Sequence, residues 1–244
     1  MTTQPERVTF PPRNLRGIEL EGVLLDGGGR PCVISHPHPL AGGDMDHPVV
    51  EAVWRAAAEA GMKALRYNFR GVGNSTGQLT ERSPLATADL GGAVDFLGGG
   101  PVMAAGYSYG ARTTLHALHA GERIDRAALI GLPTRLPANP AAMSNLLLGR
   151  RIRDEQYHES NDAELAATAP QPILVVAGDK DPLVQFDQLE ERGVPLFKLE
   201  GLNHFFTHRL GNQPPDEADL SALAERVVEF LLTGRLVHHG AESE

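Results

Sequence analysis

The fold is decided by the stretch Pro101-Val102-Met103-Ala104-Ala105-Gly106-Tyr107-Ser108-Tyr109-Gly110-Ala111. Its first half is an apolar run of the kind that forms a buried strand, and residues 111–120 have the pattern of a helix. A serine at such a strand-to-helix turn adopts a strained backbone with positive φ, which lifts its hydroxyl clear of the sheet. Glycines two residues to either side remove side chains that would clash there. The stretch therefore predicts that Ser108 is a nucleophile at a helix N-terminus.

Apolar runs and helical patterns alternate along the rest of the chain, which is typical of a mostly parallel sheet with helices on both faces. The predicted strands are 18–25, 31–35, 63–69, 101–105, 126–131, 172–177 and 194–200. The predicted helices are 47–60, 83–97, 111–120, 187–192 and 216–232.

The segment from Gly131 to Pro170 interrupts this alternation, because it has no clear strand and one expected helix over 145–158. Connections of this length are usually functional or carry elements of their own. We interpret residues 131–170 as a small cap over a site, within a single domain that spans residues 1–244. Residues 234–244 resemble a frayed tail.

The composition favours a soluble domain that acts on a small molecule. The chain has 244 residues, of which 41% are hydrophobic and 22% are charged, and its formal net charge is −9. An acidic chain repels nucleic acids and anionic membranes, so we expect a neutral substrate.

The single cysteine cannot form an internal disulfide. Neither a signal peptide nor a membrane span is evident, so we expect a cytoplasmic protein. The oligomeric state is not encoded in any recognisable pattern.

A serine hydroxyl needs a base to take its proton, and the base needs an acid to orient it. In folds with this strand-to-helix serine, the acid and then the histidine follow the serine in the chain. The predicted strand 172–177 is followed by Gly178-Asp179-Lys180-Asp181. The position after the turn suits a side chain that reaches across the sheet, so Asp181 is the predicted acid. Asp179 is the alternative and fits a turn former better.

The predicted base is His204, which follows the last predicted strand in the sequence Gly201-Leu202-Asn203-His204. His208 is an alternative that requires a different loop conformation. A loop histidine by itself is usually an ordinary surface residue. His204 is singled out because Ser108 and Asp181 precede it in the expected order.

A proline-rich loop, Ser35-His36-Pro37-His38-Pro39-Leu40, precedes the first predicted helix. The backbone amide of Tyr109, directly after the serine, is the predicted first donor to an oxyanion, and this loop normally supplies the second donor. Proline has no N–H group. The amide of His38 is therefore the predicted second donor, with Leu40 as the alternative.

The histidines and aspartates of the same region also suggest a metal site. They are spread over twelve residues with prolines and glycines between them, unlike contiguous metal-ligand motifs. We therefore predict no metal and no cofactor. Structural roles are expected for His36 and His47, which would support the loop and cap the helix that follows Asp46.

Several motifs together resemble the small bacterial α/β-hydrolases related to dienelactone hydrolases and acetyl-xylan-esterase-like proteins. They are His36-Pro37-His38-Pro39-Leu40 with Gly42-Gly43-Asp44-Met45, Asn68-Phe69-Arg70-Gly71-Val72-Gly73-Asn74-Ser75, Gly106-Tyr107-Ser108-Tyr109-Gly110, Gly178-Asp179-Lys180-Asp181 and Asn203-His204-Phe205-Phe206. The resemblance spans residues 15–232. It implies the α/β-hydrolase fold, with a mostly parallel eight-stranded sheet, and it implies catalytic roles for Ser108, Asp181 and His204.

Two departures limit the resemblance. Dienelactone hydrolases proper use a cysteine where this chain has Ser108, and members without a lid have a shorter connection than residues 131–170.

We therefore expect a serine hydrolase that cleaves a small carboxylic ester or a related acyl compound. A thioesterase, an aminopeptidase or an acyltransferase with the same three residues is the alternative, and a non-catalytic binding module is a third reading. An apolar pocket is expected near Tyr107, Tyr109, Phe205, Phe206 and residues 143–148.

Overall fold

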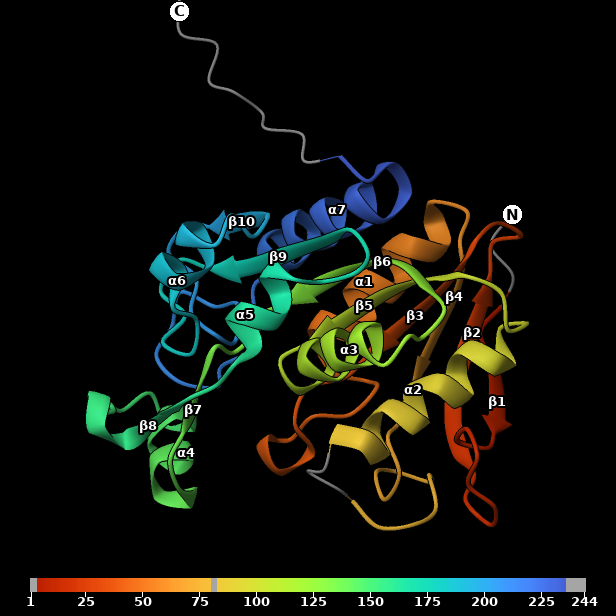
Figure 1. Cartoon of the computed structure of the whole chain (residues 1–244), viewed down its shortest axis with the longest axis horizontal. Coiled ribbons are helices and arrows are strands. Elements are labelled where there is room, and N and C mark those ends of the chain that lie inside the picture. Colours follow the sequence, from red (N-terminus) through yellow and green to blue (C-terminus); the bar gives the residue numbers. More distant parts are fainter. Residues whose placement is uncertain (1–3, 80–82, 236–244) are drawn as a thin grey trace, which may run out of the picture.

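A central sheet organises the molecule. The computed structural model describes residues 4–79 and 83–235 (Figure 1). The strands of the sheet, from one edge to the other, are β1 (Glu6–Phe10), β2 (Leu20–Asp26), β4 (Lys63–Tyr67), β3 (Pro31–Ser35), β5 (Val102–Tyr107), β6 (Ile124–Ile130), β9 (Ile173–Gly178) and β10 (Leu196–Leu199). The strand β2 is antiparallel to both of its neighbours, whereas the pairs from β4 to β10 are all parallel.

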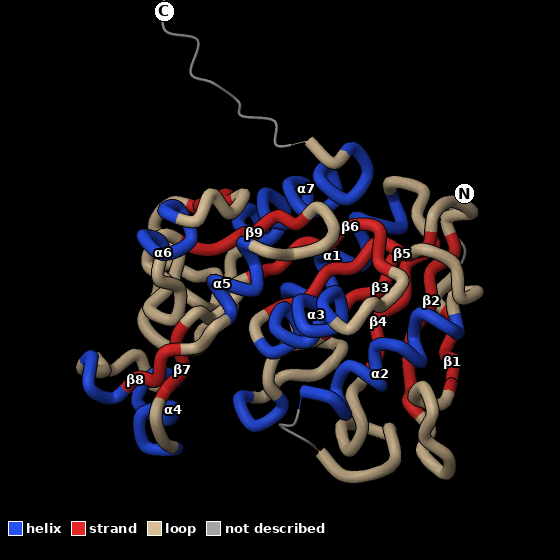
Figure 2. Tube along the Cα trace, in the orientation of Figure 1, coloured by secondary structure: helices blue, strands red, loops and turns tan. Residues whose placement is uncertain are grey.

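Helices cover both faces of this sheet (Figure 2). Two of them, α1 (Pro48–Glu59) and α7 (Glu217–Thr233), pack on one face, where Trp54 is fully buried and donates a hydrogen bond of 2.9 Å to the carbonyl of Ala64. The opposite face carries α2 (Ser83–Phe96), α3 (Tyr109–His119), α5 (Asp162–Ala167) and α6 (Phe186–Glu191). The predicted fold class, a mostly parallel eight-stranded sheet between helices, is thus confirmed.

The central strands are apolar throughout because both of their faces are covered. All six residues of β5 are buried, as are all six of β9. Their carboxyl ends point to one edge of the sheet, where Ser108 follows β5 and Asp181 follows β9. Parallel topology therefore gathers residues from distant parts of the sequence at that edge.

The structure corrects three details of the predicted elements. The strand β1 was not predicted, although the alternation of polar residues with Val8 and Phe10 indicates an edge strand. The expected helix over 145–158 is wrong: α4 spans Pro140–Leu147, because Asn139 caps it and Gly149, with φ of +68°, lies just beyond its end. Two short strands, β7 (Arg135–Pro137) and β8 (Tyr157–Glu159), pair within the segment thought to have none.

Residues 131–170, called the cap insertion below, stand off one end of the sheet, with α4, β7 and β8 farthest from it (Figure 1). A 3-10 helix over Asp154–Gln156 precedes β8, and another over Pro39–Ala41 lies in the proline-rich loop. The final residues of the expected tail, 236–244, lie outside the described residues. Among residues 4–79 and 83–235, no helix has the length and hydrophobicity that crossing a bilayer requires.

Candidate active site

Ser108 occupies the sharp turn between β5 and α3 with φ of +53°. Its amide donates to the carbonyl of Ile130 at 2.8 Å, which holds the turn against β6. A Cβ atom on Gly106 would lie 2.2 Å from the carbonyl oxygen of Gly110. A Cβ atom on Gly110 would lie 2.3 Å from the carbonyl oxygen of Ser35, at the end of β3. The first glycine thus permits the turn itself, and the second permits close approach of the neighbouring loop.

A chain of hydrogen bonds connects Ser108 to two buried residues from other loops. His204 Nε2 lies 3.0 Å from Ser108 Oγ, and His204 Nδ1 lies 2.7 Å from Asp181 Oδ2. The other oxygen of Asp181 accepts a hydrogen bond of 2.9 Å from the amide of Leu183. Asp181 and His204 are 3% and 4% exposed, so little water competes for these bonds. The arrangement orients the imidazole with its Nε2 toward the serine.

The alternatives for the acid and the base lie elsewhere. Asp179 accepts a hydrogen bond of 2.7 Å from the amide of Gly201, and Lys180 holds its pKa below the ordinary value. It therefore joins the loops after β9 and β10, as a turn former would. His208 Nε2 faces Asp219 of α7 at 3.5 Å.

The loop of His204 depends on Asn203. The side-chain oxygen of Asn203 accepts from the amide of Phe205 at 2.8 Å, and its amide nitrogen donates to the carbonyl of Arg209 at 2.7 Å. The hydroxyl of Tyr107 donates to the carbonyl of His204 at 2.8 Å. Phe206 has φ of +55°, and its side chain is fully buried in the core that packs against the loop of His204.

The proline-rich loop lies against the start of α3, where the rings of His38 and Tyr109 are 5.2 Å apart. His38 Nδ1 accepts from the amide of Leu40 at 3.1 Å. The Leu40 amide, which was the alternative oxyanion donor, is therefore already hydrogen-bonded within the loop. His36 is fully buried: its Nδ1 donates to the carbonyl of Pro37, and its Nε2 accepts from the amide of Phe69. Burial lowers the pKa of His36 to about 4.

The structural roles predicted for His36 and His47 are confirmed. His36 supports the loop, and His47 caps α1, where its Nδ1 accepts from the amide of Val49 at 3.3 Å. Within the described parts of the chain, no three His, Cys, Asp or Glu side chains are grouped as metal ligands.

A second network, which the sequence pattern did not predict, joins the segment after β4 to Met45, to Glu21 of β2 and to α2. Asn68 accepts from the amide of Met45 at 2.8 Å and donates to Glu21 at 2.7 Å. Arg70 pairs with buried Asp89 of α2. Asn68 and Arg70 belong to the motif 68–75, which carried the resemblance but had no role assigned. Polar residues directly after a buried strand were the signal that could have revealed it.

A small cavity of about 40 Å³ opens beside the serine. Its walls combine Ser108 and His204 with the proline-rich loop and with α4 of the cap insertion; the lining residues are Pro37, His38, Ala41, His47, Tyr107, Ser108, Met143, Leu146, Leu147, Leu183, His204, Phe205 and Asn212. The expected apolar lining is therefore partly right: Tyr107, Phe205 and Met143 contribute, whereas Phe206 belongs to the core.

A larger groove of about 550 Å³ lies between α4, β7 and the start of α3. It shares His38, Ala41, Met143 and Leu147 with the small cavity, so the two spaces adjoin. Tyr109, Leu136, Pro137 and Pro140 give it a mostly apolar wall, and Arg112 adds one charge.

The chain is similar in sequence to few known proteins. No protein-family model matches the chain. An uncharacterised protein of Rickettsia prowazekii is 24% identical over 194 residues, which cover 73% of this chain and 72% of that protein.

Two solved structures are similar over nearly the whole chain. One is an α/β serine hydrolase homologue from Coxiella burnetii, with 23% identity, a TM-score of 0.64 and coverage of 94% of this chain and 97% of that chain. The other is an α/β serine hydrolase without a lid from Xanthomonas campestris, with 23% identity, a TM-score of 0.63 and coverage of 94% and 95%. Structural similarity at 23% sequence identity shows a shared backbone fold and no more. Together with the strand order and the turn at Ser108, it shows that the chain has the α/β-hydrolase fold.

Proposed function

We propose that this protein is a serine hydrolase that cleaves a small carboxylic ester through an acyl-enzyme on Ser108. The observation that carries the proposal is the hydrogen-bonded chain Asp181–His204–Ser108, with distances of 2.7 and 3.0 Å, at a turn where Ser108 is held with φ of +53°. Nucleophile, base and orienting acid within hydrogen-bond reach are the requirement for nucleophilic acyl transfer.

In the first half of the proposed reaction, His204 Nε2 takes the proton of Ser108 as Oγ attacks the ester carbonyl carbon. The carbonyl π electrons move to its oxygen, which becomes the oxyanion. The amide of Tyr109 at the start of α3, and the amide of His38 in the facing loop, donate to that oxygen. The C–O bond then breaks, the leaving alcohol receives the proton from His204, and the acyl group remains on Ser108.

In the second half, a water molecule gives a proton to His204 and attacks the acyl carbon. The intermediate collapses, Ser108 recovers its proton from His204, and the carboxylic acid leaves. Asp181 accepts the hydrogen bond from His204 Nδ1 and stabilises the imidazolium that forms twice in the cycle. No cofactor takes part in these steps.

The cavity supports a short acyl group. A water-sized group occupies about 10–15 Å³ of such volume, so the 40 Å³ beside Ser108 accommodates roughly three groups of that size. The acyl group stays on the serine after the alcohol departs, so it can occupy the small cavity beside Ser108. The leaving group must exit first, which suits the larger groove. A bulky or aromatic alcohol is therefore compatible with the proposal.

The test uses p-nitrophenyl acetate and a Ser108→Ala variant. We expect the wild-type chain to release p-nitrophenol and to react at Ser108 with a fluorophosphonate, as read by intact mass. We expect Ser108→Ala to lose about 10³-fold or more in kcat and to stay unlabelled. Full turnover by Ser108→Ala would overturn the proposal.

A panel of ester, thioester and aminoacyl substrates separates the related activities that use the same three residues. A folded wild-type chain that no fluorophosphonate labels would favour a binding module instead.

A further inference from the structure

His47 lines the cavity beside Ser108, although the proposed reaction leaves its side chain unused. It caps α1 through Nδ1, which accepts from the amide of Val49 at 3.3 Å. Nδ1 acts there as an acceptor, so the proton of the neutral ring resides on Nε2. The imidazole therefore presents an N–H donor at its far end.

The neutral form of this ring persists at neutral pH. Burial, with a smaller contribution from nearby His204, lowers the pKa of His47 to about 4, and Asp44 opposes the change. The ring also packs 5.2 Å from the ring of Tyr107, on the wall of the same cavity. A neutral donor at this place does not repel the imidazolium that forms on His204 during the proposed reaction.

The other polar side chains of the cavity already have roles. Ser108 and His204 carry the chemistry, the Tyr107 hydroxyl donates to the carbonyl of His204, and His38 Nδ1 accepts from Leu40. Asn212 is exposed. Within residues 4–79 and 83–235, the His47 ring is engaged through Nδ1, which accepts from Val49, and its Nε2–H is left to solvent or a ligand. His47 is a partly buried residue of the cavity wall, so water can satisfy this donor in the free protein, and an acceptor atom on a bound ligand can replace that water.

We propose that the Nε2–H of His47 binds a hydrogen-bond acceptor on the acyl chain of the substrate, so that the site prefers short acyl groups with an ether, hydroxyl or carbonyl oxygen over plain alkyl chains. The inference rests on the proposed ester hydrolysis and adds the polarity of the acyl group to it. It assigns His47 a contact with the substrate in addition to its cap.

Two substrates of equal shape isolate this contact. In p-nitrophenyl methoxyacetate an ether oxygen replaces one CH₂ of p-nitrophenyl butanoate, and that oxygen can only accept a hydrogen bond. The methoxyacetate is intrinsically more reactive, so the quantity compared between variants is the ratio of the two kcat/KM values. Intrinsic reactivity cancels in that comparison.

Two variants separate the cap of His47 from its donor. The carboxamide of His47→Asn ends near the position of Nδ1, so it keeps the cap acceptor and removes the distal donor. The longer His47→Gln side chain returns an N–H₂ group near the position of Nε2. His119→Asn, on the exposed end of α3, is the matched control.

We expect His47→Asn to lower the methoxyacetate-to-butanoate ratio about 3- to 10-fold, as the loss of one hydrogen bond predicts. We expect His47→Gln and His119→Asn to keep the ratio within about twofold of the wild-type value. The change should arise mainly in KM, since the acceptor lies outside the reacting bond.

An unchanged ratio in His47→Asn, with thermal unfolding showing a folded protein, would overturn the role of His47 while leaving ester hydrolysis intact. Loss of activity toward both esters to the same extent in His47→Asn would also overturn it, since that result indicates a purely structural role. Absence of Ser108-dependent turnover of either ester in the wild-type chain would instead overturn the proposed function, and the inference with it.

Discussion

At the scale of single residues, burial lowers the pKa of His36 and of His47, so both rings are neutral at pH 7. His36 is fully buried, with both ring nitrogens in hydrogen bonds to the backbone, and its pKa is lowered to about 4 from 6.5. The partly buried His47 is shifted in the same direction. His36 supports the proline-rich loop and His47 lines the cavity beside Ser108, so protonation of either would disturb the surroundings of the nucleophile.

The pKa of His36 predicts how stability depends on pH. Between pH 6.5 and pH 4 the unfolded chain protonates this residue while the folded chain does not. The unfolded state thus binds more protons, and stability falls as the pH falls. At pH 5 the loss attributable to His36 is about 2 kcal/mol. Urea unfolding at pH 7 and pH 5 measures it: the difference should shrink by about that amount in His36→Gln. An equal difference in both proteins would contradict the assignment.

At the scale of elements, the site depends on how closely β3 and its loop approach α3. Gly110, on the first turn of α3, is the contact point, because any Cβ atom there meets the carbonyl oxygens of Ser35 and His36 at 2.3 and 2.9 Å. Both partners are backbone atoms, so the contact is relieved only by separating the two elements. Such a separation also moves the loop of His38 away from Tyr109.

Gly110→Ala should therefore destabilise the protein and slow catalysis together. Overpacking of this kind costs about 1–3 kcal/mol, and the wider gap between the proposed oxyanion donors should reduce kcat about tenfold or more. Thermal unfolding and ester turnover measure the two effects. Gly100→Ala is the control, since a Cβ atom there meets nothing within 4 Å. Wild-type activity in Gly110→Ala would show that the approach of β3 to α3 is not critical.

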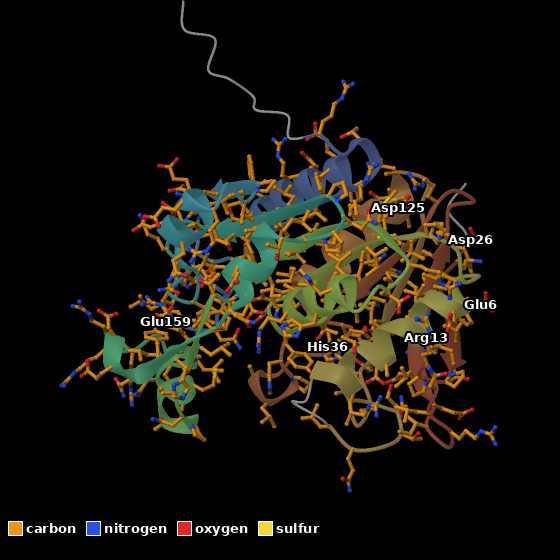
Figure 3. All side chains as sticks on the ribbon, in the orientation of Figure 1. Glu6, Arg13, Asp26, His36, Asp125 and Glu159 are labelled. Carbon is orange, nitrogen blue, oxygen red and sulfur yellow. The ribbon has the colours of Figure 1, made fainter. Side chains whose placement is uncertain are left out.

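At the scale of the whole molecule, α4 of the cap insertion forms part of the cavity wall, so the position of the insertion relative to the sheet affects the site. Asp162, fully buried at the start of α5, receives Arg112 at 2.7 Å and His116 at 3.0 Å, both from α3. On the other side, Glu159 of β8, labelled in Figure 3, accepts from Gln185 at 3.1 Å and from Gln188 at 3.3 Å. These contacts attach α5 and β8 of the cap insertion to the body, and β8 pairs with β7, the strand that precedes α4.

Loss of the buried anchor should loosen the cap insertion. We expect Asp162→Ala to lower global stability by about 1–3 kcal/mol, because it leaves Arg112 and His116 without their carboxylate. We expect faster hydrogen exchange across residues 135–160 and a higher KM, since Met143, Leu146 and Leu147 lose their fixed position. Glu159→Ala removes only exposed contacts and should have a smaller effect. Equal exchange in Asp162→Ala and the wild-type chain would indicate that other contacts hold the insertion.

Local sequence was enough to predict most of the architecture. The alternation of apolar runs with helical patterns predicted the central strands and the long helices, because period and burial are encoded in neighbouring residues. The glycines around Ser108 predicted its turn for the same local reason. The order of Ser108, Asp181 and His204 followed from strand ends that parallel topology collects at one edge. The ends of α4 were also encoded, in Asn139-Pro140 and Gly149, although the expected helix was placed too late.

Only the tertiary structure decided which residues of separate loops and helices contact one another. The link from Asn68 to Met45 joins two loops, the anchor from Asp162 to α3 joins the insertion to the body, and the cavity wall combines Leu146 with Phe205. None of these pairs is adjacent in the sequence, and each depends on packing between elements that pattern alone does not position. The sequence by itself determined that Ser108 stands at a strained turn. The fold decided which residues surround it, because side chains from separate loops meet only after the sheet has assembled.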